Sequence, residues 1–384
     1  MTAPSYHPLD PQTLDDPYPV YRAMREQGRP VWNQALDSWV LTSYTHCREV
    51  LSDPVTFAAD FRRAGETVAE VGLDVHTIDP PEHTAIYSVM GSVINGMVTP
   101  ELSIDVRSKV TAMIDDLPPG PVDLIREFTE PLARWFIPRA IGLPPFDLEV
   151  VAPIADAITE AMDSGLNPAA REPGVAAQGA LAALIEEWVA DLPADQHLPM
   201  LVSRATGAGV PRHIIMNSMR TLVVNGFTAI PASLGNALHA VGRHRIRLAE
   251  CTRPAELTRT AHEFFRYEAA IQGTTRLAVT DTDLFGAPVK RGQGVLMLFA
   301  AANRDPHVFQ NPDDIVPDRW PNPHLAFGYG AHACTGSILA ALLLREVISV
   351  LADRKLMVCL DRPGVYKRLA TVRTLDTLRA ELKE

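Results

Sequence analysis

The chain has 384 residues, of which 47% are apolar, so it can bury a sizeable hydrophobic core. Its formal net charge of -11 argues against nucleic acid or an anionic membrane as a partner. Length alone does not decide how many domains it forms, because large single-domain enzymes exceed the usual domain size.

The cysteine pattern and the N-terminus indicate where the protein works. The four cysteines lie far apart and without paired spacing, which favours a reducing compartment over a disulfide framework: Cys47, Cys251, Cys334 and Cys359. Residues 1–10 resemble neither a signal peptide nor an anchor, and no uncharged apolar run approaches the length of a membrane-spanning helix. We therefore expect a cytoplasmic protein with no membrane partner.

The N-terminal part predicts a helix, a hairpin and a second helix. Residues 20–27 and 44–53 have helical spacing, whereas residues 31–32 and 38–42 alternate as two strands joined by a polar turn. Residues 57–77 are polar and weakly periodic, which indicates a long loop. Loops of that size in compact enzymes are usually lids or binding loops.

The segment Ile78-Asp-Pro-Pro-Glu-His83-Thr84 predicts a turn that starts a helix. On this local evidence alone, His83 could be a surface residue of a capping turn. Amphipathic helices are then predicted over the next hundred residues, separated by proline-rich or glycine-containing turns: 103–117, 124–141, 148–162 and 175–192. The pattern of this middle portion predicts only helices and loops, and it does not identify a substrate.

Residues 211–241 predict a long central helix, because apolar side chains surround it almost completely. Pro231 has no backbone N–H to donate to the carbonyl of Phe227, which predicts a kink and a released acceptor. A plain bend in a long helix is the alternative.

Three Glu-x-x-Arg spacings follow, namely Glu250 with Arg253, Glu256 with Arg259, and Glu263 with Arg266. Such pairs are usually surface ion pairs of small energetic value. Only the third encloses two phenylalanines, so we expect it to be buried, and a buried pair needs a further partner.

Residues 274–279 and 289–298 predict strands, with Gly286 and Gly292 at turns, and residues 356–382 alternate as further strands. Together with the helices, they predict a mainly α fold with small β-sheets.

Residues 325–339 combine two glycines, a cysteine and the start of an apolar helical run. Gly328 and Gly330 can form a tight loop, and Cys334 lies where the loop gives way to a helix predicted over residues 337–351. The positive end of a helix dipole is expected to lower the pKa of a thiol, which makes Cys334 a candidate metal ligand. The alternative is a buried cysteine that acts as a small apolar residue.

The pattern Phe327-Gly-x-Gly-x-His332-x-Cys334-x-Gly336 resembles the heme loop of the cytochrome P450 family, specifically its soluble bacterial branch. The resemblance extends over essentially the whole chain and implies one cytochrome P450 fold domain over residues 1–384 with heme b as cofactor. It makes Cys334 the axial thiolate ligand of the iron. It also implies that Phe327 shields the sulfur, that Gly328 and Gly336 shape the loop, and that His332 reaches a heme propionate.

The same resemblance assigns roles outside the loop. His83 and Arg276 would bind propionates, although an exposed strand cation is an alternative for Arg276. The segment Pro317-Asp-Arg319-Trp would supply the third member of a buried cluster with Glu263 and Arg266. That cluster would support the heme loop.

Three positions depart from the family pattern. The family usually has Arg four residues after the His83 position, where this chain has Tyr87, which can hydrogen-bond a propionate but cannot neutralise it. In the family, an acid and an alcohol on the central helix deliver protons during oxygen activation. In a register set by Asn225-Gly226, this chain has Thr228 at the acid position and Ala229 at the alcohol position. Ala341 replaces an Arg that commonly helps to position an acidic electron donor, so ferredoxin docking should weaken.

The leading hypothesis is a heme-thiolate monooxygenase-type oxidoreductase of bacterial specialised metabolism, such as antibiotic biosynthesis. It would hydroxylate, couple or desaturate a small molecule. Thr228, Asn225 and Ala229 would line the distal side, which is the face of the heme opposite Cys334. A ferredoxin and its reductase would be the electron donors. The second hypothesis is a redox-independent or peroxide-using enzyme, such as a cyclase, dehydratase or isomerase. The third is a non-catalytic binding protein that retains the fold.

Overall fold

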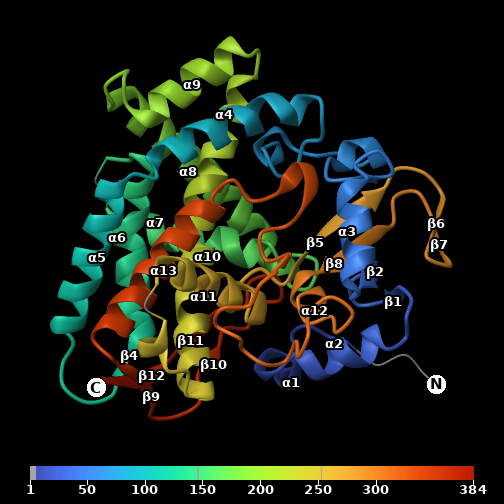
Figure 1. The fold of residues 1–384 in the computed structure, drawn as a ribbon. Helices are drawn as coiled ribbons and strands as arrows, with labels where there is room; N and C mark the ends of the chain where they lie inside the picture. Colours follow the sequence, from blue (N-terminus) through green and yellow to red (C-terminus); the bar gives the residue numbers. More distant parts are fainter. Residues whose placement is uncertain (1–5, 145–146, 252) are drawn as a thin grey trace.

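The computed structural model describes residues 6–144, 147–251 and 253–384 (Figure 1). The opening residues 1–5, which carry part of the expectation about the N-terminus, lie outside this range. Helices form one side of the molecule and a small sheet with its flanking helices forms the other. The predicted mainly α architecture with small sheets is confirmed. No helix in the described ranges has both the length and the apolar character needed to cross a membrane.

The N-terminal elements build the sheet side. They are α1 (Pro11–Asp15), α2 (Tyr18–Arg25), β1 (Val31–Asn33), β2 (Ser38–Leu41), α3 (Tyr44–Ser52) and β3 (Phe57–Ala58). The predicted helix, hairpin and helix are therefore confirmed. Beyond β3, residues 59–77 hold only two short 3-10 turns, as the loop prediction requires.

The main sheet has five strands in the order β1-β2-β8-β5-β3. β5 (Gly273–Ala278) and β8 (Gly294–Leu298) come from far along the chain, and β8 pairs with β2 in parallel. The prediction of one strand over residues 289–298 is wrong. β7 (Ala287–Val289) pairs with β6 (Thr282–Leu284), and the turn at Gly292, with φ of 83°, separates it from β8.

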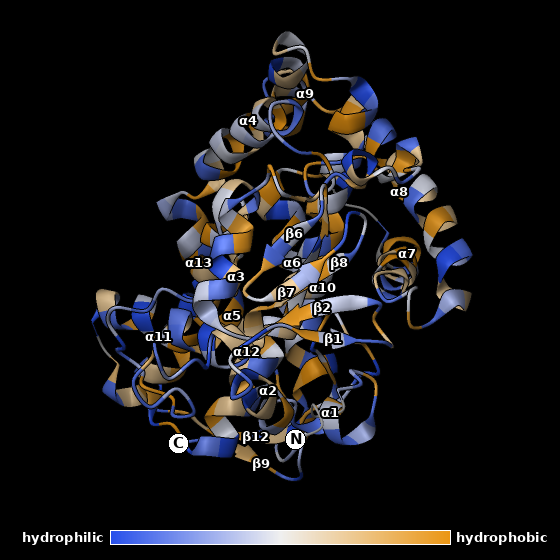
Figure 2. Cartoon of the chain, turned by 90° about the vertical axis from the view of Figure 1, so that its right-hand side faces the viewer, coloured by the Kyte–Doolittle hydropathy of each residue, from blue (hydrophilic) through white to orange (hydrophobic). Residues whose placement is uncertain are grey.

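The helical side is formed by the middle of the chain. It contains α4 (Glu82–Met97), α5 (Pro100–Asp115), α6 (Glu130–Ile141), α7 (Leu148–Ala161), α8 (Arg171–Asp191) and α9 (His197–Gly207). A π-helical turn (Ile125–Thr129) leads into α6. The sequence reasoning missed α9. In Figure 2, α7 is coloured largely hydrophobic, whereas α8 alternates between hydrophilic and hydrophobic residues.

The central helix α10 (Arg212–His244) continues without interruption through Pro231. Its neighbours in the C-terminal half are α11 (Pro254–Tyr267), α12 (Phe299–Ala302) and α13 (Ser337–Asp353). The last strands are β9 (Met357–Leu360), β10 (Val365–Tyr366), β11 (Leu375–Thr377) and β12 (Arg379–Lys383). β12 lies between β9 and the early strand β4 (Val122–Asp123), so the C-terminal strands and the segment between α5 and α6 meet in one small sheet.

A buried ionic cluster joins α11 to the segment that precedes the cysteine loop. Glu263 and Arg266 are fully buried, and two guanidinium nitrogens of Arg266 each lie 2.8 Å from a Glu263 carboxylate oxygen. Arg319 Nε lies 3.1 and 3.0 Å from the same two oxygens. The predicted partnership of Glu263 with two arginines is therefore present in the structure.

The cluster also reaches the loop through Asn303. Arg266 donates to the Asn303 carbonyl at 2.9 Å, and the Asn303 side chain accepts from the Leu325 N–H at 2.6 Å. Leu325 opens the segment that contains Phe327 and Cys334. The position of α11 is thus transmitted to the loop by hydrogen bonds inside the core.

Replacement of Glu263 by glutamine should lower the free energy of unfolding by about 3–5 kcal/mol, because two buried guanidinium groups lose their carboxylate. Glu250→Gln changes an exposed residue in the first of the three Glu-x-x-Arg spacings and should cost at most about 0.5 kcal/mol. Urea unfolding of both variants compares the two losses. Equal losses would show that the cluster does not stabilise the fold.

Candidate functional site

The loop before α13 is a tight turn closed by its own backbone. The Cys334 N–H donates to the Phe327 carbonyl at 2.8 Å, and Gly328 and Gly330 adopt positive φ angles of 69° and 74°. A Cβ at Gly330 would lie 2.6 Å from the Leu51 carbonyl oxygen of α3. Glycine is therefore required there both by the backbone conformation and by the close approach of α3.

Cys334 presents its thiol to solvent just before α13, and the backbone N–H groups of Gly336 and Ser337 hydrogen-bond its sulfur. Burial by the surrounding protein nevertheless raises the pKa of the Cys334 thiol, and the two N–H groups offset this only in part. The prediction that the helix start lowers this pKa is wrong, because desolvation outweighs the helix terminus. A nearby positive charge would favour the thiolate, and a bound metal ion would supply one.

Two histidines and an aspartate meet between the loop and α4. His332 Nε2 donates to Asp79 Oδ1 at 3.2 Å, and the ring centroids of His332 and His83 lie 4.3 Å apart. Burial alone would raise the pKa of Asp79, but hydrogen bonds from His332, Arg63 and two backbone N–H groups lower it to about 2. Asp79 is therefore a fixed anion that orients His332.

The other sides of these two rings lack partners. His83 Nε2 and His332 Nδ1 are buried and have no hydrogen-bond partner within the described part of the chain. Burial and the nearby His332 lower the pKa of His83 to about 4, although Asp79 opposes the shift. Buried polar atoms without partners are rare in native proteins, so these two nitrogens indicate that a polar group is bound here.

Arg276 on β5 adds a cation to the same region. Its side chain is 8% exposed and donates to the Thr274 hydroxyl at 3.2 Å and to the Thr275 carbonyl at 3.0 Å. Burial lowers the pKa of Arg276, and the Asp79 charge opposes the shift. The expected grouping of His83, His332 and Arg276 is therefore consistent with the structure.

His76 belongs to the same region but was not selected from the sequence. Burial lowers its pKa, the Asp74 charge opposes the shift, and the charges of His332 and Arg276 add to it. Asp79 was missed as well. The available signal was the Asp-x-x-x-His spacing of Asp79 and His83, which places a carboxylate one turn before the histidine.

Tyr87 faces the loop rather than open space. Its hydroxyl donates to the Ala333 carbonyl at 2.8 Å, and its ring lies 4.9 Å from that of His83. Where the family pattern has an arginine, this chain therefore has a hydrogen bond that ties α4 to the residue before Cys334.

An aromatic group lies behind the loop on the α11 side. The rings of Phe327 and Phe265 have centroids 4.8 Å apart. His262 Nδ1 and His324 Nε2 lie 3.0 Å apart beside them, and burial lowers the pKa of His324 to about 3. Sequence reasoning missed both histidines, because no motif spacing connects them.

The middle of α10 has an unusual exposure pattern. Every position from 225 to 231 is half-buried, whereas the residues on both sides of this stretch are buried. The Thr228 hydroxyl donates to the Val224 carbonyl at 3.0 Å, and Ala229 carries no polar side-chain atom. This part of α10 therefore borders open space without offering a carboxylate to it.

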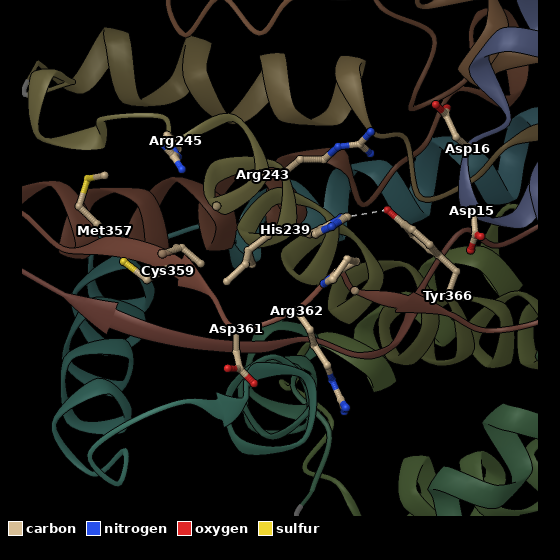
Figure 3. A pocket seen from close by; sticks show the side chains of 15 residues that line it. Asp15, Asp16, His239, Arg243, Arg245, Met357, Cys359, Asp361, Arg362 and Tyr366 are labelled. Atoms are coloured by element: carbon tan, nitrogen blue, oxygen red, sulfur yellow. Dashed lines mark hydrogen bonds between the residues drawn. The ribbon is translucent and has the colours of Figure 1, made fainter.

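One side of that stretch borders a cavity of about 850 Å³ that lies between α6, α7, α10 and residues 366–376. A second cavity, of about 940 Å³, lies at the C-terminal end of α10 against β9 (Figure 3). Figure 3 shows the side chains of Arg243, Arg245 and Arg362 pointing in different directions around it. It contains none of the predicted site residues, and its cations do not converge on one ligand.

The residues around Cys334 suit a heme in three respects. A thiol with hydrogen-bonded sulfur projects from a glycine-shaped turn. His83, His332 and Arg276 supply donors for carboxylates, and two of these side chains have orphaned nitrogens. The half-buried stretch of α10 leaves room that its buried flanks do not. Within the described residues, no hydrogen bond or ion pair joins Asn225, Thr228 or Ala229 to Cys334. The structure therefore does not by itself bring the distal residues to the thiol.

Comparison with known proteins gives one consistent result. The family model described as "Cytochrome P450" matches residues 237–351. The 20-oxo-5-O-mycaminosyltylactone 23-monooxygenase of Streptomyces fradiae is 28% identical, over 92% of this chain and 83% of its own. The erythromycin C-12 hydroxylase of Saccharopolyspora erythraea is 26% identical, over 88% of this chain and 87% of its own. The crystal structure of CalO2 superposes with a TM-score of 0.87 at 26% identity and covers 99% of both chains.

Removal of the Tyr87 hydroxyl in Tyr87→Phe should lower the free energy of unfolding by about 1 kcal/mol, because the Ala333 carbonyl loses its donor. Tyr329→Phe is the matched control, since its hydroxyl contacts only exposed Arg48 in the described structure, and it should cost less. Urea unfolding distinguishes the two. A larger loss in Tyr329→Phe would contradict the tie between α4 and the loop.

Proposed function

We propose that the chain is a member of the cytochrome P450 family that holds heme b through Cys334 and oxidises a small-molecule intermediate of bacterial specialised metabolism. The pair of orphaned histidine nitrogens beside Arg276 is the observation that carries the proposal. These buried groups need a polar partner, and the two propionates of a heme would provide it beside the Arg276 cation. Residues 6–144, 147–251 and 253–384 would act as one domain around this cofactor.

In this proposal, the residues of the chain hold and enclose the cofactor. Arg276, His83 and His332 bind the propionates, and Asp79 fixes the orientation of the His332 ring from behind. Phe327 shields the sulfur on the side of Phe265. A heme with a thiolate ligand supplies the oxidising chemistry. Tyr87 donates a hydrogen bond to the Ala333 carbonyl and contributes no positive charge to a propionate.

The nature of the substrate is inferred from the relatives. Two of them are, by name, a monooxygenase of 20-oxo-5-O-mycaminosyltylactone and a hydroxylase of erythromycin. We infer a related small molecule here, which would be hydroxylated, coupled or desaturated. Asn225 and Thr228 would border it, while water or a substrate hydroxyl would replace the proton donor missing at Ala229. A ferredoxin would dock weakly, because Ala341 supplies no cation.

The distal residues also support a second candidate. Thr228 offers no carboxylate, and its hydroxyl is already bonded to the Val224 carbonyl. An enzyme that needs no protons for oxygen activation would tolerate this arrangement. Cyclisation, dehydration, isomerisation or a peroxide-dependent reaction would fit it.

Turnover experiments separate the two candidates. The protein is supplied with NADPH, a ferredoxin and its reductase under labelled dioxygen, with 20-oxo-5-O-mycaminosyltylactone and erythronolide-type macrolactones as first substrates. A product that forms only with the complete electron chain supports the oxidase, and label in that product identifies hydroxylation rather than coupling or desaturation. A product that forms equally well without NADPH would overturn it in favour of the second candidate.

Restoration of the proton relay tests the register of α10. Thr228→Glu combined with Ala229→Thr should raise dioxygen consumption with the reductase chain by roughly tenfold or more, because positioned proton donors typically contribute about 10²–10⁴-fold. An oxygen electrode measures the rate.

The control is the same pair shifted by one residue, Ala229→Glu with Ile230→Thr, which should give no gain. If the shifted pair restores the rate instead, the predicted register is wrong. If neither pair changes the rate, proton delivery does not limit oxygen consumption in this protein.

A further inference from the structure

Segment 70–77, the last part of the predicted loop, is fixed to α10 by buried polar contacts. The Asn217 amide donates to the Leu73 carbonyl at 3.0 Å. The Ser218 hydroxyl accepts from the Val75 N–H at 2.9 Å. Side chains of α10 thus satisfy backbone groups that a mobile loop would leave to water.

Asp74 ties the backbone of His76 to the same helix. Its carboxylate accepts from the His76 N–H at 2.8 Å and from the Thr221 hydroxyl at 2.7 Å, and it lies 3.5 Å from the Arg220 guanidinium. Asp74 is 7% exposed and Arg220 is 3% exposed. Movement of the segment away from α10 would leave Arg220 in the core without its carboxylate, which is strongly unfavourable. The position of His76 is therefore fixed by the fold.

The chain is anchored a second time just beyond His76. Three residues further on, Asp79 accepts from His332 at 3.2 Å and from Arg63 at 2.8 Å. Three residues span at most about 11 Å, so the Cα atoms of His76 and Asp79 lie within that distance. His76 is thus held between α10 and the histidines of the proposed propionate site.

The side chain of His76 faces a hollow that is enclosed by protein. His76 is exposed, whereas Val75 and Ile78 on either side of it in the segment are buried. The surrounding protein nevertheless desolvates the ring and lowers its pKa. A ring on the outer surface would not be desolvated in this way. Cys334 shows the same combination of an exposed side chain and strong desolvation.

Electrostatic interactions place His76 in the group of propionate donors. The charges of His332 and Arg276 both lower the pKa of His76, and the charge of His76 in turn lowers the pKa of His83. The His76 imidazole makes no hydrogen bond within the described residues. Its ring nitrogens are therefore available to a group that binds in the hollow.

The charges around this group leave room for a further donor. Arg276 would face two propionate carboxylates, and Tyr87 adds no positive charge. The pKa of His83 is about 4, so its ring is neutral near pH 7. A buried carboxylate with too little positive charge nearby is costly unless more hydrogen bonds satisfy it.

We propose that His76 donates a hydrogen bond to a heme propionate and compensates in part for the arginine that the family pattern has at the Tyr87 position. The inference rests on the heme site proposed above. A neutral imidazole has one N–H donor, so His76 supplies a hydrogen bond and not a full charge. The contacts of segment 70–77 with α10 hold the ring in place for this bond.

Heme release from the loaded protein tests the assignment. His76→Leu removes the donor, His76→Gln keeps an N–H group, and His307→Leu removes an exposed histidine outside this group. Transfer of heme to an excess of apomyoglobin gives the release rate. Resonance Raman spectra of the propionate bending vibrations report the hydrogen bonds to the carboxylates directly.

His76→Leu should release heme roughly tenfold faster than the parent, because a hydrogen bond to a charged group is lost. His76→Gln should stay within about threefold of the parent, and His307→Leu should match it. The propionate vibrations should shift in His76→Leu and stay unchanged in His307→Leu.

Equal release from His76→Leu and the parent would overturn the inference. Faster release with unshifted propionate vibrations would overturn it as well, since that result shows a loosened pocket without a lost propionate contact. A parent that takes up no heme would instead contradict the proposed function, which keeps the two failures distinct.

Discussion

The Glu263 carboxylate, buried and shared by the guanidinium groups of Arg266 and Arg319, is the interaction on which the position of the cysteine loop depends. The remaining donors of Arg266 reach the carbonyls of Asn303, Pro312 and Asp314. One ion cluster thereby fixes α11, the irregular segment after α12 and the start of the loop. Buried charges tolerate few other geometries, so the loop that carries Cys334 is held in one place before any ligand binds.

A second polar centre, Asp79, organises the opposite edge of the site. It accepts from the backbone N–H groups of Ala59 and Asp60, from Arg63 and from His332. These bonds place the free nitrogen of His332 beside that of His83, within reach of the strand that carries Arg276. In the proposed site, the thiol and the group of donors would be the two ends, and a heme has the matching charges at its iron and its propionates.

The parts of this arrangement that depend on local pattern could be predicted from the sequence. The long apolar helix, the glycine-shaped loop and the third Glu-x-x-Arg pair each follow from spacing or from flanking residues, and the structure contains all three. The features that the sequence could not predict depend on contacts between distant segments. The pKa of Cys334 is set by desolvation, the roles of Asp79 and His76 by residues far along the chain, and the attachment of segment 70–77 by side chains of α10 that show no motif. Gly292 was predicted at a turn, and its positive φ of 83° divides the strand that was predicted over residues 289–298.

The central claim is that the sulfur of Cys334 ligates a heme iron, and the absorption spectrum of the reduced protein with carbon monoxide tests it most directly. The account predicts the band of thiolate-ligated heme in the parent protein, its retention in Cys359→Ser, which removes another exposed cysteine, and its loss in Cys334→Ser. A parent protein that binds no heme, or a band that survives in Cys334→Ser, would contradict it.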